Sequence, residues 1–279
     1  MQRKCAPKPA SLNIAALESE KRGLKKKNPK PELGGAKRRT DLALTDDQIQ
    51  IQRRFVKGAS VSIRASFYID GFNLYHAIND LRVPHLKWNN LWVLASTLIP
   101  SKSQELVRVT FCSAFYPNDA GKRARHEKYI RAQQHFGVDV IMGHYVHEDI
   151  DCRTCQATWR KPTEKETDIN LALALIDDAH MDLFDHAYLV TNDSDQAATA
   201  KLFSKRFPLK KLTSVSPPGR RHSQHILGAG AAPALITANH LERSVMHHMI
   251  ESKNGLIVRP PEYAPPAGWV HPRDRPQKS

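Results

Sequence analysis

Short apolar segments alternate with helical patterns through most of this chain, and this alternation constrains the fold more than any other feature. The apolar runs lie at 65–70, 106–116, 138–146, 186–191 and 209–217, and the helical patterns lie at 72–80, 87–98, 118–137, 167–181 and 195–207. Strands that are apolar on both faces and separated by helices are typical of a parallel sheet covered on both sides. The sequence therefore predicts an α/β fold, a three-layer α/β/α sandwich around a mostly parallel, Rossmann-like sheet.

The two ends of the chain differ in composition from this central part. Residues 1–60 hold 15 Lys and Arg against 6 Asp and Glu, which predicts a basic, largely disordered arm, with a short helix at 45–56. A solvated tail is slightly favoured over a nucleic-acid tether as the role of this arm. Residues 251–279 form a Pro-rich C-terminal tail, expected to be extended or disordered. The folded domain is therefore predicted to span residues 61–250.

The charge balance points to an anionic partner. The chain has 42 Lys and Arg against 28 Asp and Glu, a formal net charge of +14, and nucleic acid is the leading polyanion. Four cysteines are too few for a secreted disulfide scaffold, and no secretory signal is apparent. No apolar run approaches the roughly 20 residues that a spanning helix needs. We expect a soluble, cytoplasmic protein that does not contact a membrane, with homo-oligomerisation left open.

Carboxylates follow two of the predicted strands at the point where each strand ends. Asp70 ends the first strand, with Asn73 shortly after it, and Asp193 and Asp195 follow the fourth strand in "TNDSD". Ligands of parallel α/β sheets bind at the carboxyl ends of the strands, so these side chains converge if the two strands are neighbours. Asp168 opens the helix before the fourth strand, and topology alone fixes its place less well. Mutually repelling carboxylates suit a hard divalent cation, Mg²⁺ or Mn²⁺.

Each of these residues also has a structural explanation. Capping and the helix dipole account for Asp168 and Asp195 taken singly, and a tight turn accounts for Asp70. Thr167 is placed to cap the helix that begins there. The joint placement at strand ends favours the metal site, because capping does not require Asp193 beside Asp195.

Three linked motifs resemble a known family. The segments "FYIDGFNLYHAI", "EKETDINLALALIDDA" and "YLVTNDSDQ" are similar, in this order and spacing, to the NYN domain of the PIN-like nuclease superfamily, and most of all to its LabA-like bacterial subgroup. The resemblance spans about residues 65 to 245 and implies a Rossmann-like sandwich with a metal-dependent nuclease site, usually acting on RNA. By position it implies acidic ligands at Asp70, Asp168, Asp193 and Asp195, an orienting Asn73, and supporting polar groups at Thr191 and Ser194. Many relatives have Ser-Gly-Asp-Ser-Asp and then an apolar residue, so Gln196 weakens the local packing match.

Basic residues near the predicted crevice are candidates for contacts with a phosphate backbone. Lys161 and Lys165 flank the helix that Asp168 opens, and Arg220 follows the fifth strand at its carboxyl end. With Thr191 and Ser194 they make up the predicted substrate-binding set.

A Cys-x₂-Cys pair, Cys152 and Cys155, follows two histidines, His144 and His147. Four such residues could hold zinc, but strand alternation places the histidines on opposite faces. Reduced, structural cysteines are the first interpretation and a shared or partial zinc site is the second. Cys112 lies mid-strand and is expected in the core.

The function that these features predict is a Mg²⁺- or Mn²⁺-dependent ribonuclease that hydrolyses phosphodiester bonds. The first alternative is an RNA-binding or regulatory NYN-domain protein with little or no turnover, and the second is a phosphatase or 5′-nuclease-like enzyme on the same metal platform. The chain contains no P-loop, no nucleophile elbow and no dinucleotide-binding glycine fingerprint, which argues against those chemistries.

Overall fold

The structure, a computed structural model, describes residues 62–152 and 154–275. The predictions for the basic arm at 1–60, including its helix at 45–56, lie outside the described residues. The strands are β1 (Ile63–Asp70), β2 (Gln104–Ser113), β3 (Asp139–Met142), β4 (His144–Asp151), β5 (Thr158–Lys165), β6 (His186–Val190), β7 (Lys211–Ser216), β8 (Ala232–Leu235), β9 (Met249–Ser252) and β10 (Gly255–Val258). The α-helices are α2 (Gly71–Asp80), α3 (Leu91–Leu98), α4 (Ala120–His135), α5 (Thr167–His180), α6 (Ala197–Arg206), α7 (Gln224–Leu227) and α8 (Ala238–Arg243), and the 3₁₀ helices are η1 (Pro84–Lys87), η2 (Ser194–Gln196), η3 (Pro261–Tyr263) and η4 (Pro272–Asp274).

A six-stranded sheet in the order β3-β2-β1-β6-β7-β8 forms the centre of the fold, and its strand pairs are parallel. Strands β1 and β6 are direct neighbours, with Ile69 opposite Val190. On the other side of β1, Asp70 lies opposite Cys112 of β2. The predicted fold class is confirmed, and the condition for the carboxylates to converge, adjacency of these two strands, is met.

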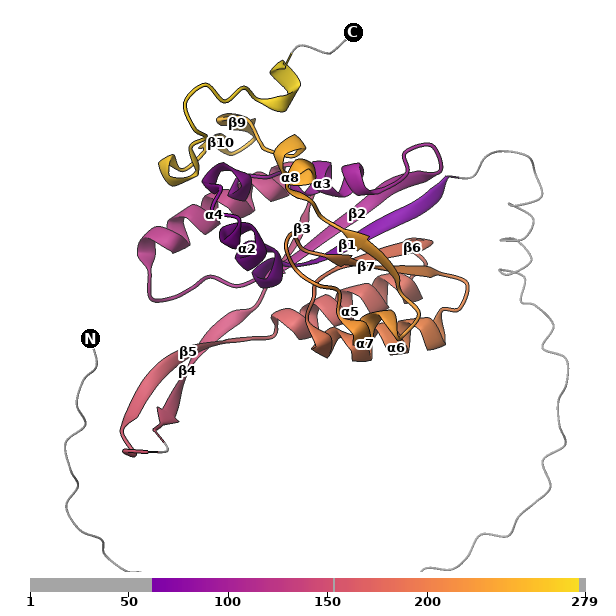
Figure 1. The fold of residues 1–279 in the computed structure, drawn as a ribbon, viewed down its shortest axis with the longest axis horizontal. Coiled ribbons are helices and arrows are strands. Elements are labelled where there is room, and N and C mark those ends of the chain that lie inside the picture. The colour runs from indigo at the N-terminus through magenta and orange to yellow at the C-terminus, as the bar shows by residue number, and fades with distance from the viewer. Residues whose placement is uncertain (1–61, 153, 276–279) are drawn as a thin grey trace, which may run out of the picture. The chain divides into compact units, whose positions relative to one another are not determined.

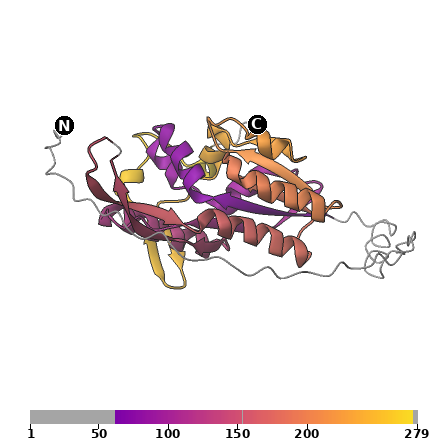
Figure 2. The same cartoon turned by 90° about the horizontal axis from the view of Figure 1, so that it is seen from below.

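Helices cover both faces of the sheet, as Figure 1 shows. Along β1 the side chains alternate between the two layers, because successive residues of a strand point to opposite faces. Phe67 and Ile69 belong to the core beneath α2 and α3, and Tyr68 belongs to the core beneath α5 and α6. Figure 2 shows α5 and α6 running side by side along their face of the sheet.

The apolar run at 138–146 is not one strand, as the sequence predicted, but two. Gly143 separates β3, at the sheet edge, from β4, which pairs with β5 in a second, two-stranded sheet. A β-carbon at Gly143 would lie 2.5 Å from the carbonyl oxygen of Lys165 and 2.9 Å from Oγ1 of Thr167, so a residue with a side chain does not fit at this position. Because β5 carries mostly exposed or half-buried polar residues, its pattern predicted a loop. The described residues of 150–159 belong to a separate compact unit.

The Pro-rich segment after residue 250 is ordered in its described part, which corrects the prediction of an extended or disordered tail. It forms the hairpin β9–β10, with Ile257 buried, and then the short helices η3 and η4. Trp269 Nε1 donates to Glu242 of α8 at 2.6 Å, and His271 Nε2 bonds the carbonyl of Val245 at 2.8 Å. The strand β8 was also missed, because four residues, "APAL", give too short a signal.

Among the helices in the described part of the chain, none has the length and apolar character needed to cross a bilayer.

Candidate acidic site

Asp70 is a buried carboxylate held by three donors. It ends β1, caps α2 and is only 2% exposed. The backbone N–H of Asn73 donates to Oδ1 at 3.0 Å, and the Asn73 side-chain amide donates to Oδ2 at 2.6 Å. Thr191 Oγ1 donates to the same Oδ2 at 3.0 Å. Burial raises the pKa of Asp70 and the charge of Asp193 adds to this, while the three donors oppose the rise without cancelling it.

The end of β6 is tied to Asp70 through its own polar side chains. Thr191 is fully buried, and its hydroxyl also accepts the backbone N–H of Asp193 at 3.1 Å. Asn192 donates its N–H to the Asn73 side-chain oxygen at 3.3 Å. Asp193 then accepts the N–H of Asp195 at 3.0 Å and caps η2. The sequence predicted that Asp195 could cap the helix, but Asp193 is the cap of η2 and Asp195 is exposed.

Asp168, the second residue of α5, completes the cluster. Its pKa is raised to about 6, first by burial and then by the negative charges of Asp70, Asp193, Glu164 and Asp195. Among the ion pairs within the described residues, none joins these carboxylates to a Lys or Arg. The structure thus brings together the four aspartates that the sequence singled out, in an uncompensated negative site.

The donor chemistry of this cluster fits a hard divalent cation. Its side-chain donors are all oxygens, the ligands that Mg²⁺ and Mn²⁺ prefer, and a cation would relieve the repulsion that, after burial, raises the pKa of Asp168. The cluster is open: among the described residues, the one group with three potential ligand atoms within 4.8 Å of one another is His247, His271 and Asp274, elsewhere in the fold. Mg²⁺ usually keeps several waters, so an open carboxylate cluster is compatible with it.

The His247–His271–Asp274 group is explained by packing. The two imidazole rings stack with centroids 3.8 Å apart. His271 Nδ1 accepts the N–H of Arg273 at 3.2 Å and its Nε2 bonds Val245, so both ring nitrogens already have partners. His271 therefore ties the C-terminal segment to the domain.

The residues predicted to bind substrate lie in different settings. Lys165 Nζ pairs with Glu148 at 2.7 Å, and Lys161 is exposed on the same strand, where its charge also lowers the pKa of Glu148. Arg220 pairs with Asp80, at the opposite end of α2 from Asp70 and about 15 Å away by the helix rise.

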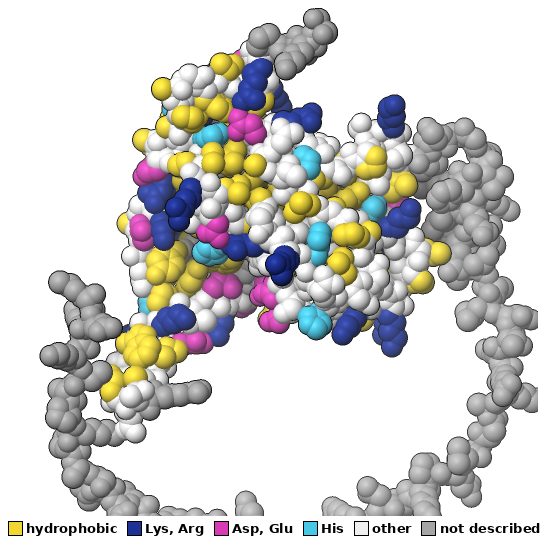
Figure 3. All heavy atoms as spheres, viewed as in Figure 1, with side chains coloured by type: hydrophobic (Ala, Val, Ile, Leu, Met, Phe, Trp, Pro, Cys, Tyr) yellow, Lys and Arg dark blue, Asp and Glu magenta, His cyan; other side chains and the backbone are white. Residues whose placement is uncertain are grey.

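Two further members of the predicted set are the polar residues of the β6 loop. Thr191 lies beneath Asp70 and is buried, so it positions the carboxylate and does not face a substrate; Ser194 is exposed on η2. The face in Figure 3 shows acidic groups among Lys, Arg and His side chains and no continuous basic patch.

Two more residues shape the site: Glu164, which was not among the sequence candidates, and Gln196, for which the sequence indicated only an effect on packing. Glu164, at the end of β5, adds its charge to the field on Asp168 and accepts the hydroxyl and the N–H of Thr167. Thr167 is therefore not the helix cap, which is Glu166 with a φ of 77° and no side-chain cap bond. Gln196 is buried and donates to the carbonyl of Asp168 at 3.0 Å, so this side chain joins η2 to α5. In the sequence, the signal for the contact between Glu164 and Thr167 was their spacing of three residues.

Among the described residues, the cysteine pair has no further zinc ligands beside it. Cys155 donates its N–H to Cys152 Sγ at 3.5 Å, and both thiols are free and half-buried. Within the described residues no group of three potential metal ligands includes either cysteine. His144 instead lies 3.1 Å from Glu166. Cys112 is buried in the sheet as predicted, and burial, then the charges of Asp70 and Asp168, raises the pKa of its thiol to about 12.

A cavity of 380 Å³ adjoins the acidic site. Its lining begins with Gly71 and Phe72, the residues that directly follow Asp70, and continues along α2 and α4. A β-carbon at Gly71 would lie 2.5 Å from the carbonyl oxygen of Cys112, so glycine lets the start of α2 pack directly on β2.

Comparison with known proteins gives no family assignment. The sequence matches no model of a known protein family. Over 200 residues it is 26% identical to 6-hydroxy-3-succinoylpyridine 3-monooxygenase HspA of Pseudomonas putida, a match that covers 59% of this chain and 63% of that protein. The chain therefore spans less than two thirds of the length of this relative. A solved structure of a protein of unknown function from Vibrio parahaemolyticus superposes with a TM-score of 0.42 at 20% identity, over 63% of this chain and 93% of that one.

Proposed function

We propose that this protein is a metal-dependent nuclease of the NYN type that hydrolyses phosphodiester bonds in RNA. The observation that carries the proposal is the uncompensated cluster of Asp70, Asp168, Asp193 and Asp195 at the carboxyl ends of β1 and β6, where the pKa of Asp168 is raised to about 6. These four residues would hold Mg²⁺ or Mn²⁺, with Glu164 at the border of the site. The cytoplasm is the compartment expected for this activity.

The chain's own residues have distinct roles in this proposal. A bound divalent cation would polarise a phosphoryl oxygen and lower the pKa of a bound water. Asn73 and Thr191 fix both oxygens of Asp70, so this carboxylate cannot rotate away from the site. Gln196 holds the start of α5, and therefore Asp168, against η2.

The test is cleavage of single-stranded and structured RNA with and without added Mn²⁺, comparing the wild-type protein with Asp193→Asn. Asp177→Asn is the matched control, because it removes the same charge from the exposed side of α5. We expect Mn²⁺-dependent cleavage by the wild type and the control and at least a hundredfold loss in Asp193→Asn, in the range seen when one electrostatic group of an active site is removed, about 10²–10³. Equal cleavage by all three proteins would refute the assigned site. RNA binding with no cleavage, and no divalent binding by calorimetry at millimolar metal, would support the RNA-binding alternative.

A second candidate function comes from the relative HspA, whose name describes monooxygenation of a substituted pyridine. The aromatic cavity beside Asp70 is of a size to take such a planar substrate. Oxygen consumption with a pyridine carboxylate and a two-electron reductant such as NADH would support this candidate, and its absence together with Mn²⁺-dependent RNA cleavage would exclude it.

A further inference from the structure

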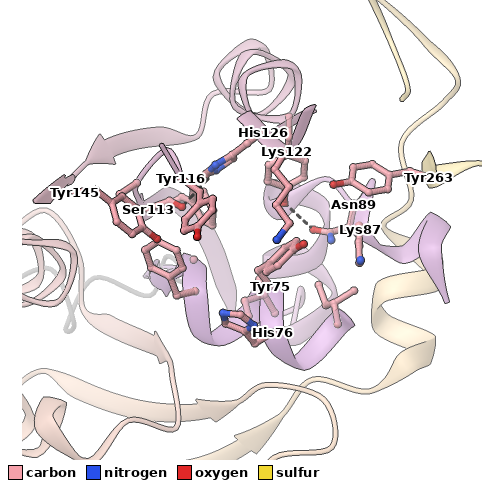
Figure 4. A pocket seen from close by; sticks show the side chains of 17 residues that line it. Tyr75, His76, Lys87, Asn89, Ser113, Tyr116, Lys122, His126, Tyr145 and Tyr263 are labelled. Carbon is pink, nitrogen blue, oxygen red and sulfur yellow. Dashed lines mark hydrogen bonds between the residues drawn. The ribbon is translucent and has the colours of Figure 1, made fainter. Parts of the chain in front are cut away.

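The cavity beside the acidic site is lined by tyrosines and lysines. It lies between α2 and α4 and reaches the end of β2 and the start of β4 (Figure 4). Tyr116 and Tyr145 lie on one side and Tyr263 and Lys87 lie on the other, with the side chain of Lys122 extending between them (Figure 4). A volume of 380 Å³ lies within the range of small-molecule sites, about 300–1,000 Å³.

The aromatic rings offer faces and edges to a planar guest. Tyr145 contacts Tyr116 edge-to-face with centroids 5.6 Å apart, and Phe72 in the same way at 6.3 Å. Aromatic side chains in this arrangement bind a further flat ring by stacking or by edge contacts. Ser113 and His126, 3.3 Å apart, add polar groups to the wall. Burial lowers the pKa of His126 to about 4, so its ring is neutral at pH 7.

Two cations in the cavity wall have no carboxylate partner among the described residues. Lys87 is half-buried, and its ammonium donates to Asn79 at 2.6 Å and lies 5.4 Å from the ring centroid of Tyr75. Burial lowers the pKa of Lys87, and the charges of Arg125 and Lys122 lower it further. Lys122 lies 5.5 Å from the ring centroid of Tyr116. A partly desolvated positive group without a counter-ion is unfavourable, and an anionic ligand would relieve this cost.

We propose that this cavity binds a planar aromatic ring that carries an anionic group, with the ring among Tyr116, Tyr145 and Phe72 and the anion at Lys87 and Lys122. Two kinds of ligand have this chemistry. One is a nucleotide, whose base would occupy the cavity while its chain continues past Asp70, and this form rests on the proposed nuclease function. The other is a free heteroaromatic acid, which does not depend on that function.

The experiment is isothermal titration calorimetry of the full chain in EDTA, so that no metal at the acidic site contributes. The probes form two pairs that differ in the anionic group: uridine 5′-monophosphate against uridine, and pyridine-3-carboxylate against pyridine-3-carboxamide. Inorganic phosphate tests for an anion site without a ring. We expect one-to-one binding of at least one charged aromatic probe and weaker binding of its neutral partner. The charged probe that binds identifies the source.

Lys122→Ala and Lys87→Met test the two cations. Lys122 is exposed on α4, so its replacement should leave the fold intact, as a thermal unfolding curve will verify. Each change should weaken the charged probe about 10- to 100-fold, the equivalent of one hydrogen bond to a charged group. Lys128→Ala, on the same helix but outside the cavity wall, should leave the affinity unchanged.

Three results would overturn the proposal: no charged aromatic probe binds at millimolar concentration, neither lysine change weakens binding, or inorganic phosphate binds as tightly as the aromatic anions. Asp193→Asn should bind the probe as the wild type does. Its failure to cleave RNA together with retained binding would separate the cavity from the catalytic proposal.

Discussion

Replacing Asp168 with Asn should stabilise the metal-free protein at neutral pH. The folded state raises the pKa of this carboxyl from 3.8 to about 6, because burial and the charges of Asp70, Asp193, Glu164 and Asp195 disfavour its ionised form. A folded-state pKa above the unfolded value means that the folded protein binds the proton more tightly. The protonated Asp168 therefore favours folding below about pH 4, and this contribution to stability is lost as the pH rises through 6. At pH 7.5 the carboxylate is ionised and opposes folding.

The size of the effect follows from the same shift. The rise of the pKa from 3.8 to about 6 corresponds to about 3 kcal/mol, and because Asp168 is only half-buried, screening by solvent reduces the value to roughly 1.5 kcal/mol. The N-terminal position of Asp168 on α5 favours a negative charge by about 0.3–1 kcal/mol, so part of the gain is lost on substitution. The penalty from burial and repulsion exceeds the favourable helix-dipole contribution, so a net stabilisation of about 1 kcal/mol remains, which raises the melting temperature by about 2–4 °C for a domain of this size.

The assay is thermal unfolding of wild type, Asp168→Asn and the exposed Asp177→Asn control at pH 7.5 and pH 4, in EDTA and with Mn²⁺. In EDTA at pH 7.5 Asp168→Asn should melt above both other proteins, and the difference should vanish at pH 4. Added Mn²⁺ should stabilise the wild type and the control but not Asp168→Asn, because a ligand stabilises only a folded state that binds it. A melting temperature for Asp168→Asn at or below that of wild type in EDTA at pH 7.5 would show that burial and the neighbouring charges do not make the ionised Asp168 oppose folding.

Two further predictions concern groups that support the site and the sheet. Thr191→Val removes one donor to Asp70 and the acceptor for Asp193 N–H, so it should cost about 1–3 kcal/mol in urea unfolding and weaken activation by Mn²⁺. The matched control is Thr213→Val, which breaks a buried hydrogen bond to His186 at the opposite end of β6, so it should cost stability and leave Mn²⁺ activation unchanged. Burial, with the charge of Lys211 as a smaller cause, lowers the pKa of His186 to about 4, so the unfolded state binds the proton first and stability falls as the pH drops from 6.5 towards 4. The loss at pH 5 should be about 1 kcal/mol after screening, and a His186→Gln protein with an equally steep pH dependence would contradict this assignment.

The elements that the sequence predicted well are those with strong apolar patterns. The strands β1, β2, β6 and β7 and the helices α5 and α6 carry residues that are buried in the core, and burial requires the pattern that reveals them. The hairpin β4–β5 is paired by its backbone and carries mostly polar side chains, so its sequence resembles a loop. The C-terminal segment is held by single contacts such as Trp269 to Glu242, which leave no periodic signal.

The sequence by itself determined the parallel α/β architecture and the identity of the four aspartates, because strand ends and their flanking residues are local features. Only the tertiary structure decided that β1 and β6 are neighbours, that Glu164 joins the acidic field, and that Arg220 pairs with Asp80 away from it. It also decided that Thr191 supports Asp70 from below and that an aromatic cavity begins beside it, with two lysines that have no carboxylate partner among the described residues. These facts depend on which distant segments share a sheet edge or a helix face, and strand order is not encoded in the pattern of any single segment.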